Sequence, residues 1–365
     1  MKNRRLVIEL LVLHKDKAYG FQQYILNLLD YLYQHRDDIH YDQVILVCKD
    51  SERELLTRYE DKFDVMTYHA SRYPQRLWLQ TCLPLKLRLT NDDLLLSPGN
   101  TSGLVKRCPE ILVIHDLLFK RRELCNFFVR CYRKLYVPIS IKKADKIVAI
   151  SNFTKADVEH YYPNAKGKTE VIYNPIHLWK FDDSETSVIN QDYFLAISTC
   201  SDYKNQKTIF RSYKAYCEKG GKKHLVIIGI INPQSDAYKE YMRLPSAVRE
   251  SIIWKGNLSN AELGQLYRHA SCYISASKFE GFGMPVAEAM SFGLPVLLSD
   301  IPPHREVSQN KGEFFLPTDV NTLASKMLNM TFDRRDDAKD IQTAYADDKT
   351  SAIYVDLINR MCHCS

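Results

Sequence analysis

The stretch Ser277–Val296 reads SKFEGFGMPVAEAMSFGLPV and combines a glycine-rich turn, a short helical pattern and the start of a strand. Glycines let the backbone approach a ligand closely, and Pro285 is tolerated in a first helical turn because no amide donor is needed there. The amides at such a helix start favour an anion such as a diphosphate. The sequence therefore predicts a phosphate-binding turn. It consists of Gly281, Phe282, Gly283 and Met284.

Two carboxylates flank the predicted turn. Glu280 directly precedes it, and Glu288 lies about one turn into the following helix. A carboxylate repels a phosphate but accepts hydrogen bonds from hydroxyls, so we expect both residues to bind hydroxyls of sugar rings on either side of the diphosphate. A lone glutamate on an amphipathic helix is more often a solvated surface residue. The order of glutamate, glycines, proline and strand favours a site for a nucleotide sugar instead.

Short apolar runs alternate with helical patterns along the whole chain, which is typical of β-α-β units around parallel sheets. The sequence therefore predicts an α/β fold with two Rossmann-like domains facing each other across a cleft. Helices are expected from Gly20 to about His35 and over about Arg122–Ile141. The strands predicted in the first half are Leu6–Leu13, Val44–Cys48, Leu94–Leu96, Ile111–Ile114, Ile147–Ile150 and Val171–Ile172. Those predicted in the second half are Tyr193–Ile197, His224–Ile228, Ile252–Lys255, Cys272–Ile274 and Val296–Leu298.

A polar and acidic stretch, FDDSETSVINQD, follows the first half and is typical of an interdomain linker. We therefore expect an N-terminal acceptor-binding domain at residues 1–176, a linker at 177–191 and a nucleotide-sugar-binding domain at 192–345. The remaining residues, 346–365, are predicted to form a helix that packs back on the N-terminal domain.

Composition argues against several classes of protein. The chain has 365 residues with 50 Lys or Arg and 44 Asp or Glu, and a net charge of +6 is too small to indicate a nucleic-acid binder. Its ten cysteines form no CxxC pair and are predicted to be reduced thiols of a cytoplasmic protein. No run approaches the ~18 apolar residues of a membrane-spanning helix, so none is expected.

Basic residues gather in one part of the chain. Residues 101–150 hold eleven Lys or Arg against four Asp or Glu. Within this block, the segment 118–144 mixes basic residues with aromatic ones such as Phe119, Phe127 and Phe128. This composition suits an interfacial helix that lies on anionic lipid at the cytoplasmic face of a membrane, and a solvated helix face is the alternative interpretation.

The chain resembles the retaining glycosyltransferases of the large family 4 type, whose fold is the two-Rossmann-domain architecture called GT-B. The resemblance rests on Glu280 and Glu288, which match the family's Glu-x7-Glu element, and on the surrounding FEGFGMPVAEAMSFGLPVLLSD. Members that act on O-antigen and other surface polysaccharides, including mannosyltransferases, are the most similar. Further matches are TCSDYKN at 199–205, IHD at 114–116, AISNFTKADV at 149–158 and the loop containing Gly20.

The resemblance implies roles for residues of the second half. Glu288 would bind the ribose hydroxyls and Glu280 the hydroxyls of the donor sugar, while the amides of residues 282–284 would lie near the donor. Lys204 falls where the family places a lysine that neutralises the leaving diphosphate. Many members carry an arginine six residues before this lysine, at the position where this chain has Ser198.

The resemblance also implies roles for three residues of the first half. His115 matches a histidine that reaches toward the donor sugar, and its carbonyl or ring would stabilise positive charge at the anomeric carbon. Asp116 would orient the adjacent turn or face the acceptor. Gly20 lies on the first strand-to-helix loop, where a side chain would obstruct the diphosphate or the acceptor. The expected catalytic residues are thus Glu280, His115 and Lys204.

The implied activity is transfer of a hexose from a nucleotide sugar to a hydroxyl of a growing, lipid-linked glycan, with mannose from GDP-mannose as the suggested donor. We expect neither a metal nor a cofactor, because acidic pairs such as Asp92-Asp93 lack the glycine context of a metal-diphosphate site. Two alternatives stay open. One is a sugar-nucleotide epimerase of similar fold, which needs acid or base side chains in the first domain. The other is a non-catalytic partner that binds a glycan or an active transferase.

Overall fold

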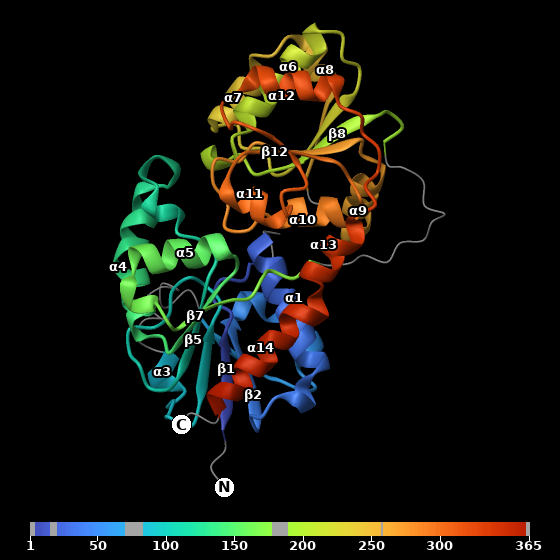
Figure 1. Ribbon diagram of the computed structural model, residues 1–365. Helices are drawn as coiled ribbons and strands as arrows, with labels where there is room; N and C mark the ends of the chain where they lie inside the picture. The colour runs from blue at the N-terminus through green and yellow to red at the C-terminus, as the bar shows by residue number, and fades with distance from the viewer. Residues whose placement is uncertain (1–3, 15–19, 70–82, 177–188, 257, 363–365) are drawn as a thin grey trace. The chain divides into compact units, whose positions relative to one another are not determined.

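The computed structural model describes residues 4–14, 20–69, 83–176, 189–256 and 258–362 (Figure 1). The chain divides into two compact units. One unit comprises Met1–Pro175 together with Asp347–Ser365, and the other comprises Ile176–Ala346. The predicted linker at 177–191 lies outside the described residues except for its last three positions.

The first unit contains a seven-stranded parallel sheet in the order β3-β2-β1-β4-β5-β6-β7. Strands β4 and β5 are buried at every position, as expected for a parallel sheet with helices on both faces. The strands are β1 (Arg5–Glu9), β2 (Gln43–Lys49), β3 (Asp64–Tyr68), β4 (Leu94–Ser97), β5 (Glu110–Ile114), β6 (Lys146–Ala149) and β7 (Thr169–Val171).

The helices of the first unit include the last helix of the chain, α14. This helix packs on α1, where the hydroxyls of Tyr24 and Tyr354 are hydrogen-bonded to each other. Its Asn359 Nδ2 also donates to the carbonyl of Asp38, which lies after α1, at 2.7 Å. The α-helices are α1 (Gly20–Gln34), α3 (Leu83–Lys86), α4 (Phe127–Lys143), α5 (Asn152–Tyr161) and α14 (Asp347–Cys362). The 3-10 helices are η1 (Arg36–Asp38), η2 (Asp50–Tyr59), η4 (Leu118–Lys120), η5 (Arg122–Leu124) and η6 (Pro163–Ala165).

The second unit contains a six-stranded parallel sheet in the order β10-β9-β8-β11-β12-β13. Its strands are β8 (Tyr193–Ile197), β9 (His224–Ile228), β10 (Ile252–Lys255), β11 (Cys272–Ser275), β12 (Val296–Ser299) and β13 (Glu313–Phe315).

Helices cover both faces of this second sheet. Figure 1 shows α6, α7, α8 and α12 on one side and α9, α10 and α11 on the other, and α6 packs against α12. The helices are η7 (Asp202–Lys204), α6 (Gln206–Glu218), α7 (Asp236–Met242), α8 (Ser246–Glu250), α9 (Asn260–His269), α10 (Met284–Ser291), α11 (Pro302–Val307), α12 (Val320–Asn329) and α13 (Ala338–Tyr345).

The predicted α/β class with two Rossmann-like domains is confirmed, but several element boundaries differ from the prediction. The first strand ends at Glu9, because the Leu13 amide donates to the Leu10 carbonyl at 3.1 Å and turns the chain. The helix expected from Arg122 begins at Phe127, because the Asn126 side chain caps it by accepting from the Phe128 amide at 3.0 Å. Strands β3 and β13 were not predicted, since both lie at sheet edges and only the last residue of each is buried.

The order of the second sheet positions the loops that carry the predicted residues. The chain connects β8 outward to β9 and β10 and then returns to β11 on the other side of β8, so the order of winding reverses between β8 and β11. Ligands of such folds bind outside the carboxyl ends of the strands at this reversal. Lys204 follows β8 and Glu280 follows β11, so both residues lie on the loops at this point of the sheet.

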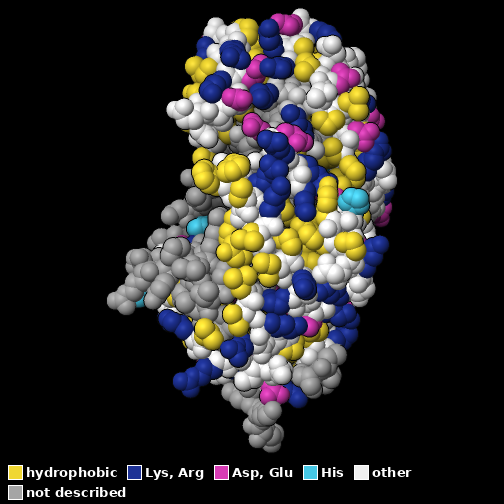
Figure 2. All heavy atoms as spheres, turned by 90° about the vertical axis from the view of Figure 1, so that its left-hand side faces the viewer, with side chains coloured by type: hydrophobic (Ala, Val, Ile, Leu, Met, Phe, Trp, Pro, Cys, Tyr) yellow, Lys and Arg dark blue, Asp and Glu magenta, His cyan; other side chains and the backbone are white. Residues whose placement is uncertain are grey.

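Helix α4 carries exposed hydrophobic side chains of the first unit. The exposed fractions are 66% for Phe127, 78% for Phe128 and 57% for Leu135, whereas Phe119 and Val137 of the same segment belong to the core. Figure 2 looks onto this side of the molecule, where hydrophobic side chains gather beside Lys and Arg. Over the described ranges, no helix combines the length and the apolarity that crossing a membrane requires.

Candidate functional site

An ion pair joins the two loops at the reversal of the second sheet. Lys204 Nζ donates to Glu280 Oε1 at 2.7 Å, and the two side chains are only 17% and 12% exposed. The loops are also joined through the backbone, because the Lys278 amide donates to the Tyr203 carbonyl at 2.7 Å. The family resemblance predicts Lys204 at the diphosphate and Glu280 at the donor sugar, and the structure brings the two side chains into direct contact.

Asn205 fixes the position of Lys204 relative to the rest of the site. This residue adopts a left-handed backbone conformation with φ of 56°, which asparagine tolerates better than most residues. Its Nδ2 donates to the Ala276 carbonyl at 3.0 Å and to the Pro317 carbonyl at 2.7 Å. One amide therefore links the loops that follow β8, β11 and β13.

Both members of the ion pair are charged at neutral pH. Burial alone would raise the pKa of Glu280, but the charge of Lys204 and the hydrogen bonds from Lys204 and Ser277 hold that pKa below its ordinary value. Burial likewise opposes the charge of Lys204, yet Glu280 and Tyr203 raise the lysine's pKa above its ordinary value. The site thus holds a cation and an anion in contact, both with limited access to water.

The glycine turn presents its backbone, because its larger side chains are buried. Phe282 and Met284 are 2% and 6% exposed, and the Phe282 ring packs edge-on against Tyr345 with the ring centres 5.1 Å apart. Gly283 precedes α10 with φ of 103°, a conformation that favours glycine, and Pro285 occupies the first turn of the helix as predicted. The residues Gly281 to Met284 would therefore contact a ligand through main-chain groups.

Glu288 lies on α10 and is 8% exposed. Its Oε2 accepts a hydrogen bond from the Tyr267 hydroxyl of α9 at 2.7 Å. Burial raises the pKa of Glu288 to about 7, although the bond from Tyr267 acts in the opposite direction. The sequence did not single out Tyr267, since a tyrosine near a helix end carries no signal of the carboxylate it contacts.

Ser198 follows β8 and is buried. Its hydroxyl donates to the Thr199 carbonyl at 3.1 Å, and its own carbonyl accepts from Gln206 Nε2 at 3.1 Å. A Cβ atom on Gly229, which follows β9, would lie 2.1 Å from the Ser198 carbonyl oxygen. The close approach of these two strand ends therefore requires a glycine at position 229.

The residues predicted in the first half belong to the first unit. His115 follows β5 and is 7% exposed, and its ring packs edge-on against Phe21 and Tyr24 at 4.4 and 4.8 Å between ring centres. Burial lowers the pKa of His115 to about 4, so the ring is neutral at pH 7. Its Nε2 donates to the Pro98 carbonyl at 2.9 Å, since a carbonyl oxygen can only accept.

Asp116 is the residue after His115 in the chain, and Gly20 is next to a residue whose ring contacts His115. Asp116 Oδ1 accepts from the Leu118 amide at 2.8 Å and pairs with Arg133 Nη1 at 3.2 Å, so this carboxylate orients the turn that begins η4. Gly20 is the first residue of α1, directly before Phe21, which contacts His115. The structure thus groups His115, Asp116 and Gly20 in one unit and Lys204, Glu280 and Glu288 in the other.

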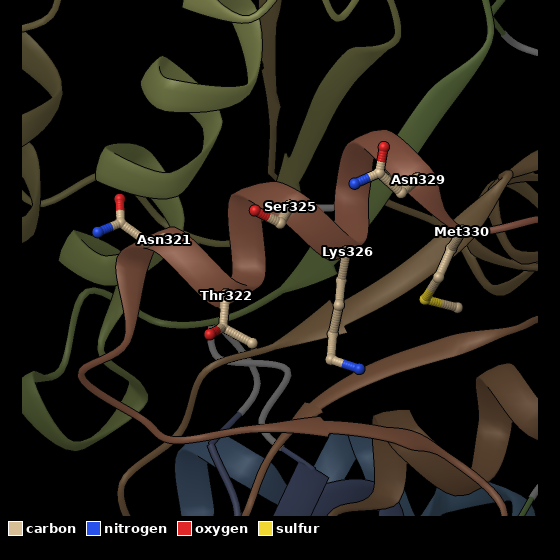
Figure 3. Close-up of a pocket in the computed structure, with 6 residues that line it drawn as sticks. All are labelled: Asn321, Thr322, Ser325, Lys326, Asn329 and Met330. Carbon is tan, nitrogen blue, oxygen red and sulfur yellow. The ribbon is translucent and has the colours of Figure 1, made fainter.

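A surface hollow lies apart from these residues. A hollow of about 370 Å³ along α12 is lined by Asn321, Thr322, Ser325, Lys326, Asn329 and Met330, none of which is a predicted site residue (Figure 3). Lys326 Nζ donates to Glu313 Oε2 at 2.6 Å. Among the residues that the structure describes, no three His, Cys, Asp or Glu side chains are grouped so as to hold a metal ion.

Comparison with known proteins identifies two families that cover both halves of the chain. The family described as "Glycosyl transferases group 1" matches residues 179–347, and the family described as "Glycosyltransferase Family 4" matches residues 19–180. Together these matches span residues 19–347.

Two relatives are mannosyltransferases by name. The O-antigen chain mannosyltransferase RfbU of Salmonella typhimurium is 24% identical over 259 residues, which cover 71% of this chain and 70% of that protein. The GDP-mannose:cellobiosyl-diphosphopolyprenol alpha-mannosyltransferase of Komagataeibacter xylinus is 30% identical over 173 residues, which cover 47% of this chain and 43% of that protein.

The fold is shared with solved glycosyltransferases. Alr3699/HepE of Anabaena, crystallised in complex with UDP and glucose, superposes with a TM-score of 0.67 at 17% identity over 98% of both chains. The two parallel sheets with their helices thus form the GT-B architecture. Since the two sequence families together match residues 19–347, this protein belongs to the family 4 type of glycosyltransferases.

Proposed function

We propose that this protein is a retaining glycosyltransferase that moves mannose from GDP-mannose to a hydroxyl of a growing, lipid-linked surface polysaccharide or O-antigen glycan. The observation that carries the proposal is the Lys204–Glu280 ion pair beside the glycine turn, at the carboxyl ends of β8 and β11. Mannose and an O-antigen are supported by the name of the Salmonella relative, and GDP-mannose by the name of the Komagataeibacter relative.

The proposed transfer uses charges that the site already holds. The bond between the anomeric carbon and the diphosphate oxygen breaks, and Lys204 neutralises the leaving diphosphate. The acceptor oxygen bonds to the same face of the anomeric carbon, and its proton passes to the leaving phosphate oxygen, so no carboxylate base and no metal is required. Glu280 binds the sugar hydroxyls on the side away from attack, and Glu288 binds the ribose.

In the proposed complex, the contact between Lys204 and Glu280 would couple the group that binds the leaving diphosphate to the group that binds the sugar. Because one carboxylate oxygen is bound to the lysine ammonium at 2.7 Å, a shift of either side chain moves the other. The glutamate also limits the strength with which Lys204 holds a diphosphate, since the ammonium charge is shared between two anions. Such sharing permits release of the nucleotide after transfer.

The neutral ring of His115 suits a reaction in which positive charge develops at the anomeric carbon. A protonated imidazole would repel that charge, whereas the low pKa of His115 keeps the ring uncharged at neutral pH. The His115 carbonyl accepts from Thr154 Oγ1 at 3.3 Å and keeps a second lone pair. We propose that this carbonyl faces the donor sugar.

Replacing Glu280 by glutamine is expected to reduce kcat by roughly 100-fold, because the charge that orients the sugar and pairs with Lys204 is lost while the side-chain shape is kept. Affinity for GDP is expected to stay within about threefold of wild type, because the ammonium of Lys204 then serves the diphosphate alone. Both quantities are measured with GDP-mannose and GDP, by steady-state transfer and by calorimetry.

The matched control is Glu313→Gln, which removes the charge of an exposed glutamate paired with Lys326 in the same unit. Wild-type turnover in Glu280→Gln would contradict the proposed role. Release of an altered nucleotide sugar without acceptor would favour the epimerase alternative, and failure to bind any nucleotide would favour a non-catalytic partner.

Binding of GDP-mannose is expected to weaken about tenfold between about pH 8 and about pH 6, because the carboxylate form of Glu288 accepts the ribose hydroxyls more strongly than the acid. With a pKa of about 7, Glu288 passes from mostly ionised to mostly protonated over this interval. GDP-mannose is used because its diphosphate is esterified at both ends and does not titrate there. Calorimetry on Glu288→Gln should give affinity independent of pH, and an unchanged pH slope in that variant would refute the assignment.

The proposed location is the cytoplasmic face of a membrane, with α4 as the peripheral contact. Phe127, Phe128 and Leu135 are exposed on this helix, as are Lys134 and Lys142. Apolar side chains that insert between headgroups and cations that attract anionic lipid are the two components of interfacial binding. A lipid-linked acceptor gives such a contact a purpose.

We expect the protein to sediment with vesicles that contain phosphatidylglycerol and to bind pure phosphatidylcholine at least about fivefold more weakly. The reason is that each Lys or Arg at the surface contributes about 1 kcal/mol of binding free energy only when the lipid is anionic. The double variant Phe127→Ser/Phe128→Ser should lose this binding, while Leu316→Ser, which changes a side chain 63% exposed in the second unit, should retain it. Equal sedimentation of both variants would show that α4 is a solvated helix face.

A further inference from the structure

Tyr345 is a buried aromatic residue at the end of α13 that packs on the glycine turn. Its exposed fraction is 3%, and its ring lies edge-on to that of Phe282 with the ring centres 5.1 Å apart. Its hydroxyl donates to the Glu306 carbonyl of α11 at 3.3 Å. The sequence analysis did not single out this residue, and the mechanism proposed above does not use it. One side chain thus joins the glycine turn to α11.

The glycine turn has few restraints of its own. Phe282 stands between Gly281 and Gly283, and a glycine restricts the backbone less than any other residue does. The carbonyl of Gly283 accepts from the Val286 amide at 2.9 Å, so the placement of this glycine decides how α10 begins. Between the two glycines, Phe282 is the only side chain through which neighbouring elements can hold the turn.

Helix α13 holds the Tyr345 ring at a fixed place along α10. Ile341, Gln342 and Tyr345 share one face of α13, because they are three or four residues apart. Ile341 is fully buried, and Gln342 Nε2 donates to the Ser291 carbonyl at the end of α10 at 2.7 Å. Since Tyr345 contacts Phe282 before the start of α10, α13 runs along α10 in the opposite direction.

The backbone of Tyr345 is held as well. Its carbonyl accepts from the Ile176 amide at 3.0 Å, and Ile176 forms a parallel bridge with Ala346. Ile176 is the first residue of the second unit and Ala346 is the last. The residue that packs on the glycine turn is therefore fixed at the place where the chain enters and leaves this unit.

We infer that Tyr345 is a positioning residue that holds the glycine turn in the conformation that binds the donor diphosphate. The inference rests on the proposed function of that turn. A segment that is ordered before its ligand arrives binds more tightly, because less conformational entropy is lost on binding. Without the Tyr345 ring, the main-chain amides of residues 282–284 would have to be ordered by the donor itself.

The substitution Tyr345→Leu removes the aromatic ring. It is expected to raise the KM for GDP-mannose and the Kd for GDP roughly tenfold, while kcat stays within about threefold, because a loosened turn loses binding common to the substrate and the transition state. This result is the opposite of that expected for Glu280→Gln, in which kcat falls and affinity for GDP is kept. An unchanged KM and Kd in Tyr345→Leu would overturn the inference.

The conservative variant Tyr345→Phe keeps the ring and loses only the hydrogen bond to Glu306. Its KM and Kd should stay within about twofold of wild type, because the edge-on contact with Phe282 is retained. A tenfold loss of affinity in this variant would assign the effect to the hydroxyl and would contradict positioning by the ring.

The matched control is Tyr216→Leu on α6 of the same unit. Tyr216 is also 3% exposed, and its ring lies edge-on to Phe194 with the ring centres 5.3 Å apart, so a similar contact is removed from the core. This variant should lower the melting temperature as Tyr345→Leu does, but leave the KM and Kd at their wild-type values. An equal loss of affinity in Tyr216→Leu would show that general destabilisation is the cause.

Phe282→Leu removes the same ring pair from the turn and carries the test if Tyr345→Leu does not fold. It should also weaken GDP binding roughly tenfold. The double variant should differ from either single one by no more than about twofold, because both substitutions remove one contact. Additive losses would mean that Tyr345 does not act through Phe282.

Hydrogen exchange provides a readout that needs no ligand. The amides of Val286 and Ala287 donate to the Gly283 carbonyl at 2.9 and 3.3 Å, so their exchange reports opening of the turn. Both amides should exchange at least about tenfold faster in Tyr345→Leu than in Tyr216→Leu. Equal exchange in the two variants would overturn the inference. Failure of the wild-type protein to bind any nucleotide, with fast exchange in Tyr345→Leu, would instead refute the proposed function.

Discussion

The ion pair between Lys204 Nζ and Glu280 Oε1 joins two loops whose residues are 76 positions apart in the chain. It lies where the strand order of the second sheet reverses, between β8 and β11, and the backbone bond from Lys278 to Tyr203 fixes the same two loops together. Because each charge has little access to water, removing one partner would leave the other buried and uncompensated. The glycine turn and helix α10, which carries the buried carboxylate Glu288, follow Glu280 directly in the chain.

The environments of Glu280 and Glu288 differ, although only seven residues lie between them in the chain. Glu280 accepts hydrogen bonds from the Lys204 ammonium and the Ser277 hydroxyl, which keep it ionised, whereas Glu288 has the Tyr267 hydroxyl and a pKa of about 7. One carboxylate is thus a fixed charge and the other responds to pH near neutrality. This difference fits distinct proposed tasks, orientation of the reacting sugar for Glu280 and recognition of the ribose for Glu288.

Sequence patterns predicted the fold class and most strands, because parallel strands in the core read as continuous apolar runs. They did not predict β3 or β13, whose exposed edge positions carry no such run. Glu280, Gly283 and Glu288 could be found because they lie within one contiguous segment, whereas Lys204 was found only through resemblance to a family. The contact of Lys204 with Glu280 and that of Tyr267 with Glu288 depend on tertiary packing and leave no mark in local sequence. The roles assigned to His115, Asp116 and Gly20 stay predictions.

The central claim is that Lys204 and Glu280 hold the diphosphate and the sugar of GDP-mannose during transfer with retention. The most direct measurement is the reaction of the purified protein with GDP-mannose and a polyprenyl-diphosphate-linked oligosaccharide, followed by NMR of the new glycosidic bond. An α-linked mannose, with the configuration of the donor, is the predicted product. A β-linked product would contradict retention, and no transfer from GDP-, UDP-, dTDP- or ADP-sugars would contradict the assignment of this site to a nucleotide-sugar donor.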